Sequence, residues 1–561
     1  MNNWIINMKI KMNHEYSLLV NTVGDQTTID NLYLFNLYYY FYQRGYSNLI
    51  LKDLTNLFVL IFSVGFLTFL IQCVDFSRLI KYDSQNAVSI ANYIDLKNYW
   101  NFGVFLWICF GLFIIYVIIQ SITIYTSTRK FWGIRKIFKE SFGIDSKDMS
   151  SLNWNKVMAK IIQYHTIPSL NCYTYALRIM CRENLMITMY DGLRDLNFYK
   201  YPLTKLLEWN LIFCFIDTLI NEKREIRADI KDDPQAYLKN IKKKITFVSI
   251  INVIFMPFIL LVLMLHIVLQ YGEQFYSDPS LITKRQWSLK ASWKLRYYNE
   301  LPHSFIDRMH KSAIETRIYS EQFPSRLAET ISRFCMYVLG SFFIVLASLT
   351  LLNQNLLINL NISHNRSILW YMGAIGIIIA FAKSFIHKTI LPDPEKAIKK
   401  MEKHMEIEPN WKNDPLSLKT KNEIISLFPW RIVLLLQECF YIIGTPYILY
   451  FVLREESDRI GNYLLDSLTT HHCIPGLISK YSLFNNSEQI NQNPKTQRSF
   501  ENFNKIYPEW NLNSFMYNDI NESLYPQNTQ HNQSTSYKEH DDEFDEEPDN
   551  TLIDIDHDNL Y

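Results

Sequence analysis

Two apolar runs decide the fold: Thr55–Phe76, TNLFVLIFSVGFLTFLIQCVDF, and Gly103–Tyr125, GVFLWICFGLFIIYVIIQSITIY. Each is long enough to cross the hydrocarbon core of a bilayer as one helix, which takes about 20 apolar residues. The first run carries one charge, Asp75, at its end, and the second carries none. Two further runs, Phe334–Leu352 and Ile368–Ile390, have the same character. The sequence therefore predicts an all-α, polytopic membrane protein with four transmembrane helices.

Two other apolar runs are interrupted, and the sequence leaves two structures open for each. Thr246–Tyr271 has Pro257 at its middle, where a proline removes a backbone donor and kinks a helix. Trp430–Leu453 carries Glu438 and then a Gly-Thr-Pro break that ends at Pro446. Such runs are either ordinary kinked spans or re-entrant segments, which are tolerated where they are buried in protein or line a water path.

The distribution of basic residues predicts the topology. The connection Ser77–Phe102 has three basic residues, whereas Thr126–Ile245 has 21. By the positive-inside rule the long connection is cytosolic and the short one lumenal. Met1–Leu54 is then cytosolic, and Asn353–Ser367, with one basic residue, is lumenal. If both interrupted runs re-enter, the segment 272–333 and the C-terminal part are cytosolic as well.

The water-facing parts differ in character along the chain. The stretch Asp148–Asp232 has helical periodicity. Residues 126–245 and 272–333 are predicted to be cytosolic helical regions, and 391–484 to form cytosolic helices around the second interrupted run. From about Asn485 the sequence turns to Asn, Gln, Ser, Asp and Glu, and Glu539–Tyr561 carries 11 acidic side chains. Such a composition buries too little apolar surface to fold. Residues 485–561 are therefore predicted to be a disordered acidic tail, whose deletion leaves the assembly intact.

The composition and the motifs argue against several classes of function. The formal net charge is +1, so nothing electrostatic points to nucleic acid as a partner. The chain has no P-loop, no H-E-x-x-H and no G-x-S-x-G motif, and its cysteines show no C-x-x-C spacing. We therefore expect no catalytic residue, metal or cofactor. Without a nucleotide site, any transport is passive or coupled to another gradient.

Charged side chains inside apolar runs are the informative ones, because a charge at membrane depth costs several kcal/mol and usually faces protein or water. Lys383 and Glu438 are the main candidates. The alternative for Lys383 is an ammonium that snorkels to the cytosolic interface. The alternative for Glu438 is a charge on the cytosolic side of a shallow helix.

Several stretches, taken together, resemble the signature motifs of the autophagy-related protein 9 family. The resemblance runs in one consistent order from about Asn31 to Phe484. The first motif departs from the family pattern at Cys181 and Leu185, and Lys383 replaces an arginine. The matching stretches are Arg178–Ile187 (RIMCRENLMI), Leu203–Leu211 (LTKLLEWNL), Trp287–His303 (WSLKASWKLRYYNELPH), Lys383–Ile386 (KSFI) and Thr445–Leu449 (TPYIL), the last preceded by Glu438.

This resemblance implies more than composition does. Members of the family have four transmembrane helices and two re-entrant segments, and they assemble as domain-swapped homotrimers around a central pore. They are ATP-independent phospholipid scramblases on Golgi- and endosome-derived vesicles that seed the autophagosome, or phagophore, membrane. They work with a lipid-transfer protein and other autophagy factors. The resemblance thus favours re-entry for 246–271 and 430–453.

The resemblance also suggests roles for particular side chains. Candidates for the lipid path are Lys383, Glu438, Lys284 and Arg285. The motif residues expected to be structural are Arg182, Glu183, Asn184, Glu208, Trp209, Asn210, Trp287, Asn299, Glu300 and Pro446. Two other functions remain open: an ion channel or transporter that uses Lys383 and Glu438, and a membrane scaffold that recruits autophagy partners.

Overall fold

The computed structural model describes residues 30–76, 94–95, 103–165, 170–194, 196–277, 284–323, 326–352, 361–363, 366–383, 386, 393–471, 474–484 and 493–510. Within them the chain is mostly helical, as the sequence predicts. Strands form two short antiparallel hairpins there. They are β1 (Asn361–Ser363) with β2 (Arg366–Ser367), and β3 (Leu468–His471) with β4 (Ile474–Ser479).

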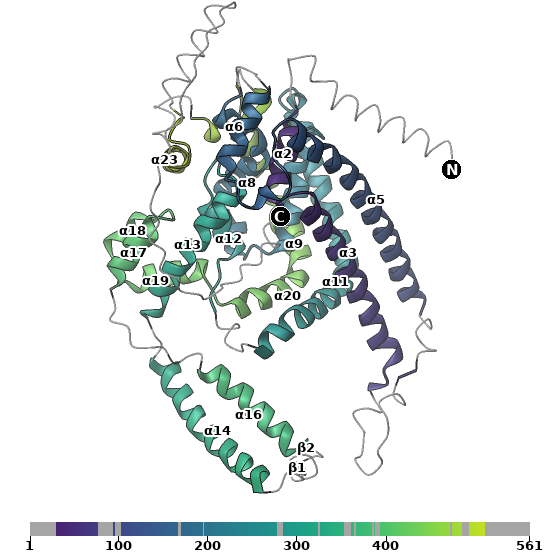
Figure 1. Ribbon diagram of the computed structural model, residues 1–561, viewed down its shortest axis with the longest axis vertical. Coiled ribbons are helices and arrows are strands. Elements are labelled where there is room, and N and C mark those ends of the chain that lie inside the picture. The colour runs from purple at the N-terminus through teal and green to yellow at the C-terminus, as the bar shows by residue number, and fades with distance from the viewer. Residues whose placement is uncertain are drawn as a thin grey trace, which may run out of the picture.

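Long apolar helices form one part of the molecule. Helix α3 (Tyr46–Cys73) packs against α5 (Val104–Glu140), and together they contain the first two predicted spans (Figure 1). Four helices of the described segments are long and apolar enough to cross a membrane. They are Tyr46–Cys73, Pro234–Leu269, Glu329–Leu352 and Arg431–Asp466.

The two interrupted runs form continuous helices, which corrects the predicted break near Pro446. Helix α11 (Pro234–Ser277) passes through Pro257, and α20 (Arg431–Tyr447) passes through Pro446. The chain then continues without a gap through a π-helical stretch, η8 (Ile448–Leu453), into α21 (Arg454–Asp466). The Thr445 hydroxyl donates to the Tyr441 carbonyl at 2.5 Å, and the wider π-helical turns absorb the local disruption. Re-entry itself stays a prediction.

Helices α14 (Arg326–Leu352) and α16 (Ile368–Lys383) form a hairpin that lies apart from the other helices (Figure 1). The two helices pack on each other, and strands β1 and β2 lie between them in the sequence. None of the most apolar 18-residue window of α14 is buried by the chain. Helix α16 ends at Lys383, and most of the predicted continuation to Ile390 lies outside the described residues.

Shorter helices fill the water-facing part. They are α2 (Asn31–Tyr42), η3 (Asp148–Ser150), α6 (Trp154–His165), α7 (Cys172–Ile179), α8 (Cys181–Gly192), η4 (Asn197–Lys200), α9 (Lys205–Leu211), η5 (Ile212–Ile216), α10 (Asp217–Leu219), η6 (Ala228–Ile230), α12 (Leu289–Leu295), α13 (Pro302–Glu321), α17 (Pro394–Glu402), α18 (Pro409–Asn413), α19 (Leu418–Leu427), η9 (Lys480–Ser482) and α23 (Pro494–Ile506).

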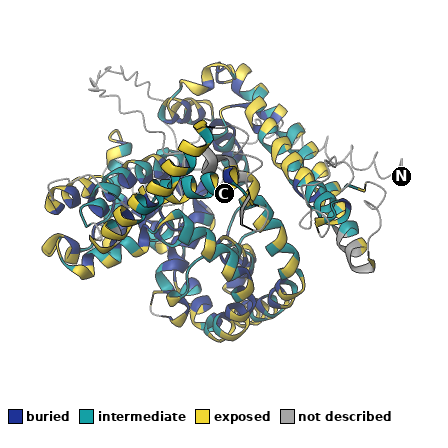
Figure 2. Cartoon of the chain, turned by 90° about the horizontal axis from the view of Figure 1, so that it is seen from below, coloured by how far each residue is buried: buried dark blue, intermediate teal, exposed yellow. Residues whose placement is uncertain are grey.

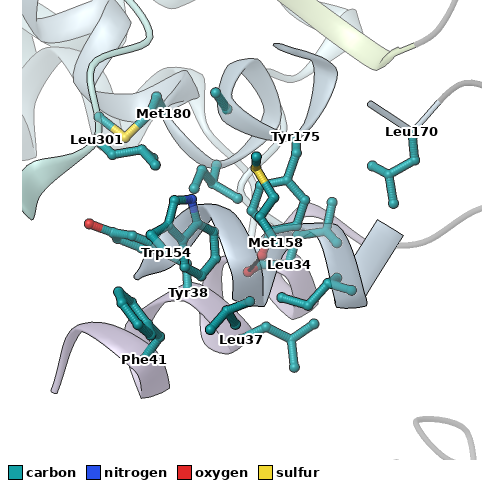
Figure 3. Packing of buried hydrophobic residues seen from close by; sticks show 14 of the residues in the cluster. Leu34, Leu37, Tyr38, Phe41, Trp154, Met158, Leu170, Tyr175, Met180 and Leu301 are labelled. Atoms are coloured by element: carbon teal, nitrogen blue, oxygen red, sulfur yellow. Dashed lines mark hydrogen bonds between the residues drawn. The ribbon is translucent and has the colours of Figure 1, made fainter. Parts of the chain in front are cut away.

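Three clusters of buried hydrophobic side chains hold these helices. The first joins α2, α6 and α7 around Tyr38, Trp154 and Tyr175 (Figure 3). The second joins α8, α9, η5, α11, η8 and α21. The third joins α12, α13 and α17–α19. Helices α11 and α21 approach so closely that a Cβ on Gly461 would lie 2.4 Å from the Leu238 Cδ2, so a larger residue there requires the Leu238 side chain to move. Buried residues concentrate in this helical body, whereas the long helices stay exposed along much of their length (Figure 2).

Helix α23 corrects the prediction that the whole of 485–561 is a disordered tail. Phe503, Tyr507 and Trp510 are each less than 9% exposed and pack in the first cluster. The Lys495 ammonium lies 3.3 Å from the Asp191 carboxylate. The overall composition hid Phe503 on the helix and Tyr507 and Trp510 just after it, and these aromatic side chains dock the segment on the first cluster. Residues 511–561, which include the acidic stretch, lie outside the described residues.

Candidate functional site

Two of the signature motifs, Leu203–Leu211 and Trp287–His303, come together near the first half of α20, and we call this region the junction. The strand-like segment 284–288 runs antiparallel to 427–431. The Gln286 amide donates to the Pro429 carbonyl at 3.0 Å, and the Ser288 amide to that of Leu427 at 3.0 Å. The Arg431 amide donates to the Lys284 carbonyl at 2.9 Å. Two segments that lie far apart in the sequence thus position the first turn of α20.

Arg285 lies inside this pairing. Its Nη1 donates to the Phe428 carbonyl at 3.2 Å, and its guanidinium carbon lies 5.2 Å from the centre of the Trp430 ring. Burial lowers the pKa of Arg285. The contacts hold a cation beside the start of an apolar helix, where a guanidinium can pair with phosphate.

Glu438 reaches from α20 to the N-terminus of α9. Its two carboxylate oxygens accept from the Lys205 backbone N–H at 3.1 and 3.2 Å. The Thr204 hydroxyl caps the same helix by accepting from the Leu207 amide at 3.4 Å. A carboxylate at a helix N-terminus is favourable, because it satisfies a free N–H and opposes the helix dipole. Glu438 therefore has a structural partner outside α20.

Glu208, one turn into α9, joins a second motif. Its carboxylate accepts a hydrogen bond from the indole N–H of Trp293 on α12. Burial raises the pKa of Glu208 to about 7, and the negative charge of Glu438 acts in the same direction. The nearby cations Lys205 and Arg296 act in the opposite direction. The junction thus contains two neighbouring carboxylates with different partners.

The neighbouring motif residues differ in exposure. Trp209 is 60% exposed and stacks on Phe213 with ring centres 5.6 Å apart. Asn210 is fully buried and accepts from the Asn252 amide on α11 at 3.3 Å. Trp287, at the start of the third motif, donates from its indole N–H to the Met309 carbonyl at 3.2 Å. These contacts anchor the motifs to α11 and α13.

A second motif contact lies deep in the helical body. The Asn184 amide nitrogen donates to the Asn299 side-chain oxygen at 2.8 Å, and the Asn299 backbone N–H donates back to the Asn184 oxygen at 2.9 Å. The Asn299 amide nitrogen also donates to the Ser482 carbonyl at 2.8 Å. Asn299 has φ 60°, a left-handed conformation that asparagine tolerates better than most residues.

The remaining motif residues form ion pairs. Glu300 pairs with Arg308 through two contacts of 2.6 and 2.7 Å, and both side chains are nearly buried. Arg182 pairs with Asp217 at 2.9 Å. Glu183 lies 3.6 Å from Arg224. The structure therefore gives each of these residues a partner of opposite charge, and their structural roles stay a prediction.

The junction unites three of the four lipid-path candidates but omits Lys383. Lys284 and Arg285 lie at the start of α20, and Glu438 lies about two turns further along it. Lys383 is exposed at the end of α16, in the separate hairpin (Figure 1). Pro446 is buried further along α20. No group of His, Cys, Asp and Glu among the described residues could hold a metal ion.

Sequence reasoning missed two residues of the junction. Lys205 contributes a backbone N–H, which no side-chain pattern reveals. Trp293 lies within the WSLKASWKLRYYNELPH motif, but its partner Glu208 is 85 residues away. The signal that could have pointed to Trp293 is its indole N–H, since a partly buried indole N–H usually has an acceptor.

Comparisons with known proteins agree with the motifs. The chain is 26% identical over 551 residues to an autophagy-related protein 9 of Dictyostelium discoideum, covering 91% of this chain and 77% of that one. It is 29% identical over 482 residues to that of Kluyveromyces lactis, covering 81% of this chain and 52% of that one. The chain thus spans about half the length of some relatives.

The fold agrees as well. The cryo-EM structure of Schizosaccharomyces pombe Atg9 matches with a TM-score of 0.60 and 22% identity, over 81% of this chain and 98% of that one. A family profile described as autophagy protein ATG9 matches residues 25–485. The profile includes every motif of the junction, and the chain therefore belongs to the ATG9 family of autophagy proteins.

Proposed function

We propose that the chain is an ATP-independent phospholipid scramblase that equilibrates lipids between leaflets while autophagosome membranes form and expand. The observation that carries this proposal is the junction, where charged groups adjoin an exposed apolar helix. A phospholipid crosses a bilayer slowly because its charged headgroup has to enter hydrocarbon. Polar groups at membrane depth lower that cost, while the acyl chains remain in lipid. The protein is then a passive conduit and not an enzyme.

The charges of the junction suit a phospholipid headgroup. Arg285 offers a guanidinium to the phosphate, and Lys284 lies next to it. Glu438 offers the opposite charge to a choline or ethanolamine group. Helix α20 exposes Leu436, Phe440 and Ile443, which suit contact with acyl chains. A zwitterionic lipid thus finds complementary groups on α20 and on the segment 284–288 paired with its start.

We further propose a domain-swapped homotrimer. The α14–α16 hairpin supports this, because it exposes Phe334, Tyr337 and Ile344 by 65–78% and lies apart from its own chain's other helices (Figure 1). Docking of the hairpin against a neighbouring copy would bury part of this surface. In such an assembly Lys383 could approach the junction of another subunit.

Family membership supports the cellular proposals. These are residence in phagophore membranes and in Golgi- and endosome-derived vesicles, and cooperation with a lipid-transfer protein and other autophagy factors. A lipid-transfer protein delivers lipid to one leaflet, and a passive scramblase would relieve the resulting imbalance.

Purified full-length protein in liposomes tests the central proposal. Liposomes with a small fraction of fluorescent phospholipid receive an external reducing quencher without ATP. We expect complete quenching with the protein and about half without it. A double variant, Lys284→Gln with Arg285→Gln, should slow the exchange, whereas Lys403→Gln with Lys419→Gln, two exposed lysines outside the junction, should not.

The same vesicles separate the alternative functions. Ion flux without lipid exchange would indicate a channel or transporter. Absence of both activities from well-folded protein that still recruits autophagy factors would indicate a scaffold, and would end the scramblase proposal.

A further inference from the structure

Helix α5 carries an exposed row of aromatic and basic residues, which we call the α5 stripe. It consists of Tyr125, Arg129, Trp132, Lys136 and Lys139, spaced four, three, four and three residues apart. Residues with this spacing share one face of a helix. Tyr125 is 58% and Trp132 is 49% exposed, and the three basic residues are exposed as well.

The opposite face of the same segment is fixed to the helical body. Phe131, Ile134 and Phe138 are at most 5% exposed and pack in the first cluster. This packing prevents rotation of the helix about its axis and holds the α5 stripe outward. Helix α5 also lies at the edge of the molecule (Figure 1). The stripe is therefore an external surface with a fixed orientation.

The α5 stripe continues the apolar face that precedes it. Ile115, Ile118 and Ile122 are 47–55% exposed and lead directly to Tyr125 on the uninterrupted helix. At 1.5 Å per residue, Arg129 lies about 6 Å and Trp132 about 10 Å beyond Tyr125 along the axis. The headgroup region is about 5–7 Å thick on each side of the hydrocarbon. If Tyr125 marks the edge of the hydrocarbon, Arg129 lies at headgroup depth and Trp132 just outside it.

Aromatic rings hold the guanidinium groups in place. The Arg129 guanidinium carbon lies 5.6 Å from the Tyr125 ring centre. That of Arg135 lies 5.3 Å from Trp132 and 5.6 Å from Tyr46, the first residue of α3. The Tyr46 and Trp132 rings meet edge to face at 5.6 Å. Stacked guanidiniums keep their in-plane donors available for a phosphate.

The charge of this segment has one dominant sign. Helix α5 has five basic residues, all between Arg129 and Lys139, and its one acidic residue is Glu140 at the end. Helix α3, which packs on α5, has one acidic residue, Asp53, and Lys52 precedes it. Clusters of four to eight basic residues next to a membrane-spanning helix attract anionic lipids, by about 1 kcal/mol per charge.

We propose that the α5 stripe is a binding site for the headgroups of anionic phospholipids. The ligand carries a phosphate for the stacked guanidiniums and an additional negative charge for Lys136 and Lys139. The site lies on the outer face of α5, away from the junction. The proposed binding site is therefore independent of the proposed scrambling path, and either proposal can be disproved without the other.

Native mass spectrometry of the full-length protein in detergent tests this site, with phosphatidylserine or phosphatidylcholine added at equal concentration. The variant is Arg129→Gln with Lys136→Gln. The matched control is Lys403→Gln with Lys419→Gln, two exposed lysines in the part of the molecule formed by α17–α19. We expect a preference of wild-type protein for phosphatidylserine that falls at least fivefold in the variant, since about 1 kcal/mol per charge corresponds to about fivefold. The control should keep the preference.

Two further measurements make the result decisive. Unchanged assembly mass and melting temperature show that the variant is folded, and Lys136→Gln alone serves if the double variant is not. Trp132→Ala should lower the retention of phosphatidylserine, because Arg135 loses one of its two aromatic stacking partners. Equal retention of phosphatidylserine by variant and control would overturn the proposal. Loss of binding to soluble polyglutamate with phosphatidylserine unaffected would instead assign the stripe to an acidic protein.

Discussion

The carboxylate of Glu438 on α20 accepts the backbone N–H of Lys205 at the N-terminus of α9, at 3.1 and 3.2 Å. A charge within an apolar helix is thereby tied to a helix of the water-facing body. The contact connects two motifs that lie 233 residues apart. It makes Glu438 both a candidate for lipid contact and a helix cap, and substitutions can separate these roles.

Glu438→Leu should destabilise the protein by about 1 kcal/mol, the usual cost of losing an N-terminal cap. Glu438→Gln retains an oxygen acceptor and should recover most of this loss, because only the charge–dipole part is removed. Thermal unfolding in detergent measures both. Glu455→Leu, which replaces an exposed carboxylate on α21, is the matched control. Equal melting temperatures for the Glu438→Leu variant and wild type would show that the cap contributes nothing.

The Glu208 carboxyl should make stability depend on pH. Its pKa rises from 4.5 to about 7 on folding, mainly through burial. The unfolded chain therefore releases this proton at lower pH than the folded one. The contribution of Glu208 to the free energy of unfolding is thus most favourable below pH 4.5. It declines as pH rises from 4.5 to 7 and is lost above that.

Glu208→Gln tests this dependence. Glutamine stays neutral and still accepts from the Trp293 indole. The variant should be more stable than wild type at pH 8 and show a smaller change in melting temperature between pH 5 and 8. A wild-type slope in the variant would assign the pH dependence to other groups.

The Asn184–Asn299 pair should couple strongly in a double-mutant cycle. Asn299→Ala leaves the Asn184 amide nitrogen and the Ser482 carbonyl without their partner and places alanine at φ 60°, so we expect a loss of about 2–3 kcal/mol. Asn299→Gly removes the same hydrogen bonds without the backbone strain and should cost less. Chemical unfolding of the single and double variants gives the coupling, and strict additivity would exclude a shared interaction.

Truncations should distinguish α23 from the acidic tail. Deletion of 511–561 should leave melting temperature and assembly unchanged. Deletion of 485–561 should lower both, because it removes Phe503, Tyr507 and Trp510 from the first cluster. Trp510→Ala in the full chain should cost about 3–5 kcal/mol by opening a cavity. Identical melting curves for the two truncations would mean that α23 adds no stability.

Lys383 should affect lipid exchange if its ammonium faces the lipid path of the trimer. Lys383→Leu should then slow scrambling while preserving assembly, because leucine enters a membrane helix at no cost. Lys383→Arg should retain activity, since the charge remains. The quenching assay with purified variants measures both. Wild-type exchange by the leucine variant would favour a lysine that only snorkels to the interface.

The sequence by itself determined the helical fold class, the candidate membrane spans and the family. Helix formation follows local periodicity and membrane crossing follows the length of an apolar run, so both can be predicted from consecutive residues. The signature motifs identified the family in the same way, because each motif is a short continuous stretch of sequence. Trp287–His303 needed no structure to be recognised as a single unit.

Only the tertiary structure decided which motifs meet. Two contacts join distant residues: Glu208–Trp293 spans 85 residues and Glu438–Lys205 spans 233. The second uses a backbone N–H, which every residue except proline has, so the sequence cannot predict it. The folding of α23 depended in the same way on a cluster assembled from α2, α6 and α7. Its aromatic residues have no core of their own, because a short amphipathic helix is stable only against the surface that buries it.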